Sequence, residues 1–131
     1  MDIFSSFATD ETAEVEGRWF PISKTAKLLV ARAGNADYLA LLRKRLDASG
    51  IDLTGATKED DAAAEVLFID VMASTILKGW EGVSFKGEVL PYSVANARTL
   101  LGVKDFRKKV SGFSDTVEAF RLKADEALGN A

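Results

Sequence analysis

Residues 61–78 restrict the possible folds of this chain more than any other segment. As a helix, the segment is apolar on nearly every side. One apolar stripe at helical spacing is formed by Val66, Ile69, Ala73, Ile76 and Trp80. Four neighbouring apolar residues widen this stripe: Leu67, Phe68, Val71 and Met72. Asp61 at its start and Lys78 at its end complement the helix macrodipole. A helix that is apolar nearly all round is usually central in its domain. We therefore predict a central helix over residues 61–78.

Asp70 is a charged residue in the middle of this predicted helix. It has two interpretations, a buried acid with a shifted pKa or a solvated position at the edge of the helix. The second is favoured, because aspartate is almost never fully buried unless it is paired.

The segment after this helix carries a dense set of turn and cap signals. Gly79 is expected to end the helix, and Lys86-Gly87 is expected to form the turn of a short hairpin over residues 83–90. Ser93 is a natural N-cap for a helix over residues 94–101. Gly102 then closes that helix.

The N-terminal third predicts a small sheet. Residues 14–33 are expected to form a β-hairpin, in which Leu28 and Val30 share one face. Pro21 would be awkward in a central strand, so the sheet should be small and edge-like. Residues 1–13 form an arm, which either packs on the core or docks onto a neighbour.

Two further helices complete the predicted fold. Asn35 is expected to cap one that ends at Gly50. A final helix over residues 104–127 carries an apolar seam, and Gly112 weakens this helix in the middle. The seam consists of Phe106, Val110, Phe113, Val117 and Phe120. The fold class is therefore α+β and mainly α-helical, with about four helices, one small antiparallel hairpin and a second hairpin-like loop. We expect one domain over residues 1–131, with an arm (1–13), a folded body (14–121) and an exposed tail (122–131).

Composition argues against catalysis and against nucleic acid. The chain has 131 residues, no Cys, no His and a formal net charge of −3. The commonest general base and the thiolate nucleophile are therefore both missing. Its Gly residues form no phosphate-binding loop, and no spacing typical of a metal site is present. We expect no enzyme, no cofactor, no metal and no nucleic-acid partner, with a small carboxylate-based enzyme as the weaker alternative.

No apolar run approaches the roughly 18 residues of a membrane span. The first 17 residues contain five carboxylates and no Lys or Arg, which does not fit a signal peptide. We therefore expect a soluble cytoplasmic protein without a membrane partner.

Once catalysis, nucleic acid and membrane are disfavoured, binding to another protein is the class of function that remains. Aromatic side chains are the best anchors of protein interfaces. Nine positions are candidates for a partner or oligomer interface: Phe4, Phe7, Trp19, Phe20, Phe85, Tyr92, Phe106, Phe113 and Phe120. Each could equally be part of the core.

Several motifs in chain order resemble the tail assembly chaperones of long-tailed bacteriophages. They are residues 4–10 with FATD at 7–10, EGRW at 16–19, ARAGN at 31–35 with Tyr38, ILKGWEGV at 76–83, GE at 87–88, LPYS at 90–93 and NA at 96–97. The resemblance covers roughly residues 1–121. Its structural motif residues are Gly34, Asn35, Tyr38, Gly79, Trp80, Gly82, Pro91, Ser93 and Asn96. Val94-Ala95 departs from the pattern, since members often have an acidic residue there.

The resemblance implies a protein of the siphophage type that binds the tape measure protein in the host cytoplasm and keeps it soluble. It further implies recruitment of tail tube subunits through a frameshifted extension, self-association, and absence from the mature virion. A structural component of the head–tail joint is the alternative among binding proteins.

Overall fold

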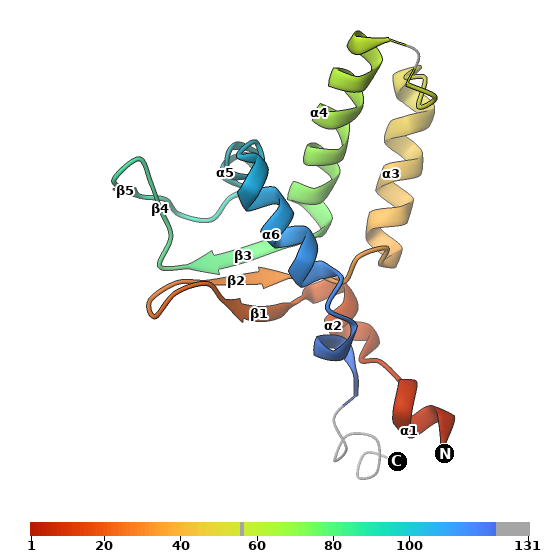
Figure 1. Cartoon of the computed structure of the whole chain (residues 1–131), viewed down its shortest axis with the longest axis vertical. Helices are drawn as coiled ribbons and strands as arrows, with labels where there is room; N and C mark the ends of the chain where they lie inside the picture. Colours follow the sequence, from red (N-terminus) through yellow and green to blue (C-terminus); the bar gives the residue numbers. More distant parts are fainter. Residues whose placement is uncertain (56, 123–131) are drawn as a thin grey trace.

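The computed structural model describes residues 1–55 and 57–122 and has an elongated shape (Figure 1). It contains a three-stranded antiparallel sheet, a two-stranded ribbon, six α-helices and a short 3-10 helix within those residues. The mixed, mainly helical fold class is therefore confirmed.

The chain begins with two short helices. Helix α1 (Ile3–Phe7) is capped by Asp2, and α2 (Glu11–Glu16) is capped by Asp10. Val15 therefore lies in a helix, and the prediction that the hairpin begins at residue 14 was wrong. The Asp10 carboxylate accepts the N–H of Ala13, which satisfies a free donor of the first turn and starts the helix. Helix α2 also crosses the boundary that was expected at residue 13.

The main sheet has the order β1-β2-β3, with β1 at Arg18–Pro21, β2 at Lys27–Val30 and β3 at Leu77–Glu81. Leu28 and Val30 are both fully buried on one face, as the alternation predicts. Pro21 lies in the edge strand β1, where its missing N–H costs no interior ladder bond.

The central helix is shorter than predicted. Helix α4 runs over Lys58–Thr75, and the chain then enters β3 directly. Lys78, Gly79 and Trp80 therefore belong to a strand, and the prediction that Gly79 ends the helix was wrong. The physical reason is pairing, because β3 completes the backbone hydrogen bonds of β2 with Leu28 opposite Trp80.

The 83–90 hairpin is present as β4 (Ser84–Phe85) and β5 (Glu88–Val89), in a ribbon separate from the main sheet. Helix α5 (Val94–Leu101) follows, and the Ser93 hydroxyl caps it by accepting the N–H of Asn96 at 3.0 Å. Both the predicted hairpin and the predicted cap are confirmed.

Helix α3 (Ala36–Ser49) packs beside α4, and the pair extends away from the sheet (Figure 1). Helix α6 (Lys104–Ser114) packs on β2 and is followed by the 3-10 helix η1 (Val117–Phe120). The predicted seam is therefore not one helix, since Phe120 reaches the core from η1 after the chain has left α6. Residues 123–131, which hold the end of the predicted helix and nearly all of the predicted tail, lie outside the described residues.

One apolar core joins these elements. Its fully buried large side chains come from β2, β3, α4, α5, α6 and η1: Leu28, Val30, Val71, Leu77, Leu101, Val110 and Phe120. The α3–α4 pair buries far less, because α3 has no buried residue and α4 buries only residues of its last turns. The part of the pair far from the sheet therefore keeps apolar side chains at the surface.

Candidate protein-interaction surface

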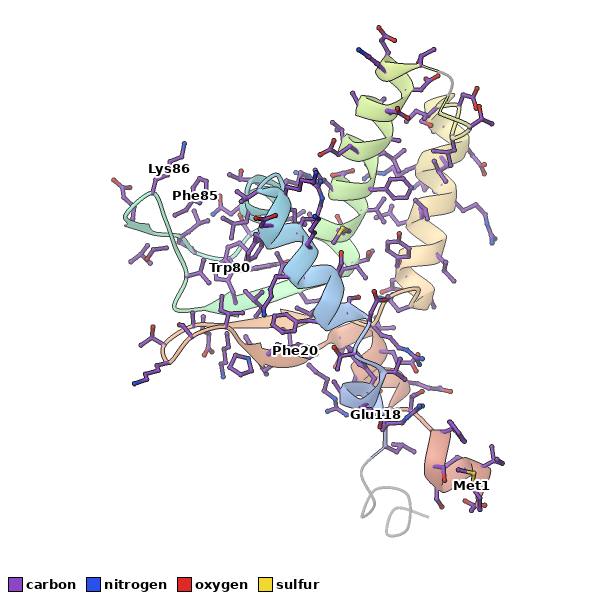
Figure 2. All side chains as sticks on the ribbon, viewed as in Figure 1. Met1, Phe20, Trp80, Phe85, Lys86 and Glu118 are labelled. Carbon is purple, nitrogen blue, oxygen red and sulfur yellow. The ribbon has the colours of Figure 1, made fainter. Side chains whose placement is uncertain are left out.

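Helix α1 presents an apolar face to solvent. Ile3, Phe4 and Phe7 are 63%, 60% and 50% exposed, and Met1 before them is 95% exposed. Ile3, Phe4 and Phe7 share one side of the helix, because residues three and four positions apart are neighbours on a helix surface. A cluster of large exposed apolar side chains marks an interaction site more often than a surface without function. Figure 2 shows Met1 at the extreme end of the molecule.

The base of this arm is tied to the end of the described chain. Ala8 O accepts the N–H of Leu122 at 3.0 Å, and Asp10 N donates to Phe120 O at 2.8 Å. The Arg121 guanidinium donates to Phe7 O at 2.8 Å and lies 5.4 Å from the centre of the Phe7 ring. These contacts fix the direction in which α1 leaves the body.

A second feature is an open groove of about 500 Å³ between α4 and α6, here called the α4–α6 groove. Its lining combines apolar side chains of α4 with polar and small residues of α6: Glu65, Phe68, Ile69, Met72, Arg107, Lys108, Ser111, Gly112 and Asp115. Gly112 leaves it open, because a Cβ at that position would meet nothing within 4 Å. An apolar floor with charged rims suits an amphipathic helix.

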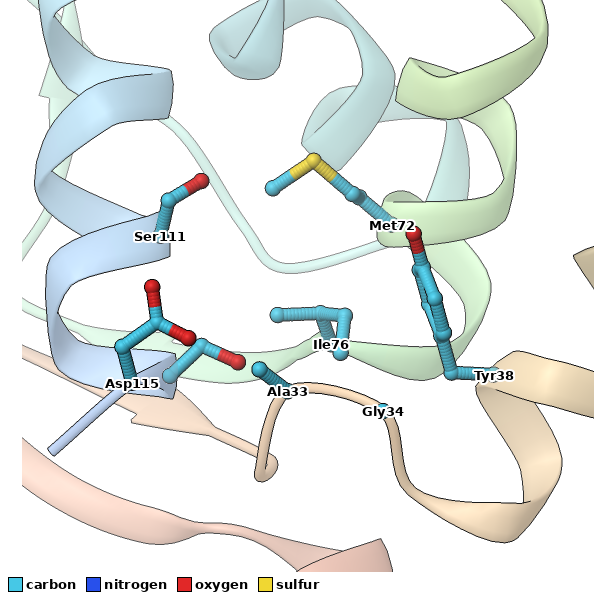
Figure 3. Close-up of a pocket in the computed structure, with 8 residues that line it drawn as sticks. Ala33, Gly34, Tyr38, Met72, Ile76, Ser111 and Asp115 are labelled. Carbon is cyan, nitrogen blue, oxygen red and sulfur yellow. The ribbon is translucent and has the colours of Figure 1, made fainter. Parts of the chain in front are cut away.

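A smaller pocket of about 140 Å³ continues this groove toward the sheet. Figure 3 shows Ser111 and Asp115 on one wall, facing Met72, Ile76 and Tyr38 on the other. Partial burial raises the pKa of the Tyr38 hydroxyl, so this phenol stays neutral and can only exchange hydrogen bonds at ordinary pH. The described residues contain no group of three or more metal-ligating carboxylates. The lining of the pocket consists of apolar surface from Met72 and Ile76 and of polar groups from Tyr38, Ser111 and Asp115.

A third feature is a groove of about 500 Å³ between α3 and α4, here called the α3–α4 groove. It is mostly apolar and is lined by Arg45, Ala48, Ser49, Ile51, Ala63, Val66, Leu67, Ile69, Asp70 and Arg98. Val66 is 68% exposed, although it is a large apolar residue in the middle of a helix.

Asp70 stands at one side of this groove and joins three helices. Its carboxylate accepts hydrogen bonds from Arg45 of α3 and from Arg98 of α5, the latter at 2.6 Å. The Asp70 side chain is 18% exposed, while those of Arg45 and Arg98 are 44% and 48% exposed. Asp70 is thus a largely shielded, paired carboxylate at a helix edge. The positive charges of the two guanidinium groups outnumber its single negative charge by one.

The aromatic residues proposed from sequence separate into surface and core. Phe4, Phe7 and Trp19 are exposed, and the Lys27 ammonium lies 4.5 Å from the centre of the Trp19 ring. Phe85 and Phe106 line a shallow pocket beside the ribbon.

The other four candidates hold the body together. Phe20 stacks on Phe113 with ring centres 4.6 Å apart and lies 6.4 Å from Phe120, which is completely buried. Tyr92 packs edge-on against Trp80. Phe120 therefore cannot contact a partner in this conformation.

The motif residues are mostly turn and cap positions. Asn35 caps α3 by accepting the N–H of Tyr38 at 3.0 Å, and its amide donates to Arg32 O and Thr75 O. Asn96 donates to Pro91 O at 2.8 Å. Gly82 has φ +72°, and a Cβ there would lie 2.0 Å from Thr25 O. These residues set the backbone path of the loops that link the sheet to the helices.

Sequence patterns did not indicate the groove residues Met72, Ser111 and Asp115, because their roles depend on how α4 and α6 cross. The one sequence signal was Gly112, a helix-weakening residue in an otherwise continuous pattern. Among the described residues, every helix is too short or too polar to cross a bilayer.

Comparison with known proteins gives one family. The model of the YdaY prophage protein family matches residues 33–130, which is well over half of the chain. Neither the search of curated proteins nor that of solved structures returned a match. The matched region contains α3 to η1 and both grooves. The chain therefore belongs to the YdaY prophage protein family and is of phage origin.

Proposed function

We propose that this phage protein is a tail assembly chaperone. In this role it binds the tape measure protein in the host cytoplasm, keeps it soluble and helps to recruit tail tube subunits. The family match supports the phage origin, and the resemblance of the motifs at residues 31–35 and 76–83 supports the role in tail assembly.

One observation carries the proposal, namely the α4–α6 groove. A tape measure protein is expected to be long, helical and prone to aggregate, so its chaperone must cover apolar helix faces. The groove offers Phe68, Ile69 and Met72 as a floor, with Lys108 at its rim beside the ion pair of Glu65 and Arg107, which joins α4 to α6 at 3.0 Å. An amphipathic client helix can bury its apolar stripe on such a floor and pair its flanking charges with the rims.

The absence of Cys and His from the sequence agrees with a binding role rather than a catalytic one. In a chaperone, affinity comes from buried apolar area and from paired charges, neither of which requires an acid–base group.

The experiment is co-expression with the tape measure protein encoded by the same phage, scored by the soluble fraction of the client. The blocking variant is Gly112→Arg, which places a long side chain in open space at the groove. Gly112 lies inside α6 with no φ in the left-handed region, so the substitution should raise helix propensity by up to about 1 kcal/mol. A loss of chaperoning by a variant at least as stable as the wild type is a loss of binding.

Gly112→Ala is the matched control, because it makes the same helix more stable while adding a single methyl group. We expect the wild type and Gly112→Ala to keep the client soluble and Gly112→Arg to fail. An insoluble client with the wild type would contradict the proposal. Recovery of the protein in purified virions would favour a structural head–tail component instead.

A further inference from the structure

The small pocket at the sheet end of the α4–α6 groove contains one charged side chain, that of Asp115. Its volume is about 140 Å³, and it shares Met72, Ser111 and Asp115 with the groove. Sites for drug-sized ligands are typically about 300–1,000 Å³, so this pocket suits a single side chain. Because pocket and groove share a wall, a helix that lies in the groove can place one of its residues in the pocket.

Three polar groups converge on this pocket without a partner among the described residues. They are the hydroxyls of Tyr38 and Ser111 and the carboxylate of Asp115, which face one another across the cavity in Figure 3. Within residues 1–55 and 57–122, no side-chain hydrogen bond or ion pair engages any of the three. Ser114, which also lines the pocket, is already satisfied, since its hydroxyl donates to Ala31 O at 2.8 Å. The pocket thus presents three groups that can accept hydrogen bonds from a ligand.

The helix ends around the pocket favour a positive ligand. Helix α4 ends at Thr75 and α6 ends at Ser114, so the negative ends of both helix dipoles lie at the pocket. Neither helix has a basic residue in its last turn, and Asp115 adds a carboxylate at the C-cap of α6. The positive end of α3 is also near, but Asn35 caps it and Asp37 lies in its first turn. A cation bound in the pocket would offset this negative charge.

The neighbouring basic side chains of the described chain do not supply that cation. Arg32 and Arg107 already pair with glutamates of α2 and α4, at 2.8 and 3.0 Å. Lys108 lies seven residues before Asp115, which is about 10.5 Å along α6, and it lines the groove but not the pocket. A metal ion fits poorly, because Ca²⁺ takes about six to eight oxygen ligands and the pocket has one carboxylate. The complementary charge is therefore left to a bound partner.

We propose that this pocket holds a lysine side chain of the helix that binds in the α4–α6 groove. The four methylene groups of the lysine pack on Met72 and Ile76, and its ammonium donates to the carboxylate and the two hydroxyls. An ammonium has three N–H donors, so each donor finds one acceptor group. A guanidinium is a rigid plane with five donors, which fits acceptors on opposite walls less well. This inference rests on the proposed function, since it specifies a residue that the client helix carries beside its apolar stripe.

The experiment measures the affinity of labelled helical peptides for the full-length chain by fluorescence anisotropy, with no tape measure protein present. Each peptide has about 18 residues of alanine and glutamine, long enough to form a helix, with a stripe of three leucines. One residue, a turn beyond the stripe, varies among the peptides. It is lysine in the first and norleucine in the second, which keeps an apolar stem and lacks the ammonium. It is diaminobutyrate in the third, which keeps the ammonium on a stem two methylene groups shorter.

We expect the wild type to bind the lysine peptide roughly five- to tenfold more tightly than the norleucine peptide, because only lysine makes charge-assisted hydrogen bonds. The diaminobutyrate peptide should bind like the norleucine peptide, since its shorter stem does not reach the carboxylate.

Asp115→Asn should remove the preference for lysine and leave the affinity for the norleucine peptide unchanged. Asp115 is exposed and its side chain makes no bond to another described residue, so the variant should fold. Asp105→Asn is the matched control, because it removes an exposed carboxylate from the first turn of the same helix, outside the pocket and the groove. This control should keep the preference of the wild type.

Three results would overturn the proposal. They are equal affinities of the wild type for the lysine and norleucine peptides, a lysine preference that survives Asp115→Asn, and a diaminobutyrate peptide that binds as tightly as the lysine peptide. Equal affinities would remove the pocket alone, because the groove would still bind helices. If none of the peptides binds at about 500 µM, the pocket fails and the groove fails with it. A lysine preference together with an insoluble client would instead count only against the chaperone role.

Discussion

Trp80 and Tyr92 pack edge to face, with their ring centres 5.0 Å apart and their planes at 77°. The Trp80 indole N–H donates to Leu90 O at 2.7 Å, and the Tyr92 hydroxyl donates to Leu77 O at 2.8 Å. Each side chain thus donates to a backbone carbonyl in the segment that carries the other. Together the two bonds tie β3 to the segment that leads into α5. Figure 2 shows Trp80 between the ribbon and the sheet.

Truncation of Trp80 should be severely destabilising. Trp80 is 7% exposed, so Trp80→Ala removes a packed indole and leaves Leu90 O without its donor. We expect a loss of about 3–5 kcal/mol in the free energy of unfolding, measured by urea denaturation. Trp19→Ala is the control, since Trp19 is 44% exposed and should cost far less. Equal losses for the two variants would show that Trp80 is not part of the core.

Tyr92→Phe should change the dependence of stability on alkaline pH. Burial raises the pKa of the Tyr92 hydroxyl above its ordinary value of 10.0, so the folded state holds this proton more tightly than the unfolded state. The stability that this raised pKa contributes to the free energy of unfolding is fully present below pH 10. It is lost as the pH rises through the pKa of the folded state. We expect Tyr92→Phe to cost about 0.5–1.5 kcal/mol at pH 7 and to lose less stability than the wild type above pH 10. Identical slopes for the two proteins in urea titrations at pH 9–11.5 would contradict this.

Gly82→Ala should cost much more than Gly87→Ala. Both glycines have left-handed φ values, +72° and +85°, so alanine at either position pays roughly 1–2 kcal/mol of backbone strain. Only Gly82 lies against the turn that joins β1 to β2, where the new Cβ would be 2.0 Å from Thr25 O. We expect Gly82→Ala to lose roughly a further 1–3 kcal/mol or more, as overpacking does. Thermal melts of the two variants side by side measure the difference, which should be near zero if the turn can move.

Asp70→Asn should loosen the α3–α4 pair modestly. The substitution removes both ion pairs, but Arg45 and Arg98 are about half exposed and solvent screens them. We expect a loss of about 1 kcal/mol that shrinks in 0.5 M salt. A double-mutant cycle that combines Asp70→Asn with Arg98→Ala isolates the interaction energy between Asp70 and Arg98 from the other effects of each substitution. A loss that does not respond to salt would point to packing instead.

A soluble domain fused after Ala131 should leave residues 1–120 as stable as before. The last described residues are tied by the bridge of Thr9 with Arg121 and by Leu122 N to Ala8 O. A fusion placed nine residues beyond Leu122 should leave these bonds intact, with a melting temperature within about 2 °C of the wild type, since about 1 kcal/mol corresponds to several degrees. A drop of several degrees would contradict the expected extension toward the tail tube protein.

Local chemistry alone determined a large part of this structure. The caps at Asn35 and Ser93, the left-handed Gly50 after α3 and the turn at Lys86-Gly87 were all predictable, because each depends on a residue and its neighbours within four positions. The burial of Leu28 and Val30 followed from strand alternation. The exposed aromatic residues of the arm were identified as candidates, although their exposure was not.

Tertiary structure decided the rest. Leu77 and Lys78 were predicted as the end of the central helix and Gly79 as its stop. Residues 77–81 instead form a strand, because β2 offers unpaired backbone groups that only pairing can satisfy. Phe113 and Phe120 read as one helical seam, yet the chain leaves α6 at Ser114 so that Phe120 can enter the core from η1. Both grooves also arise from the crossing of helices distant in the sequence. Sequence by itself determined the features made by near neighbours, and only the tertiary structure decided those in which distant segments compete for the same hydrogen bonds and the same apolar space.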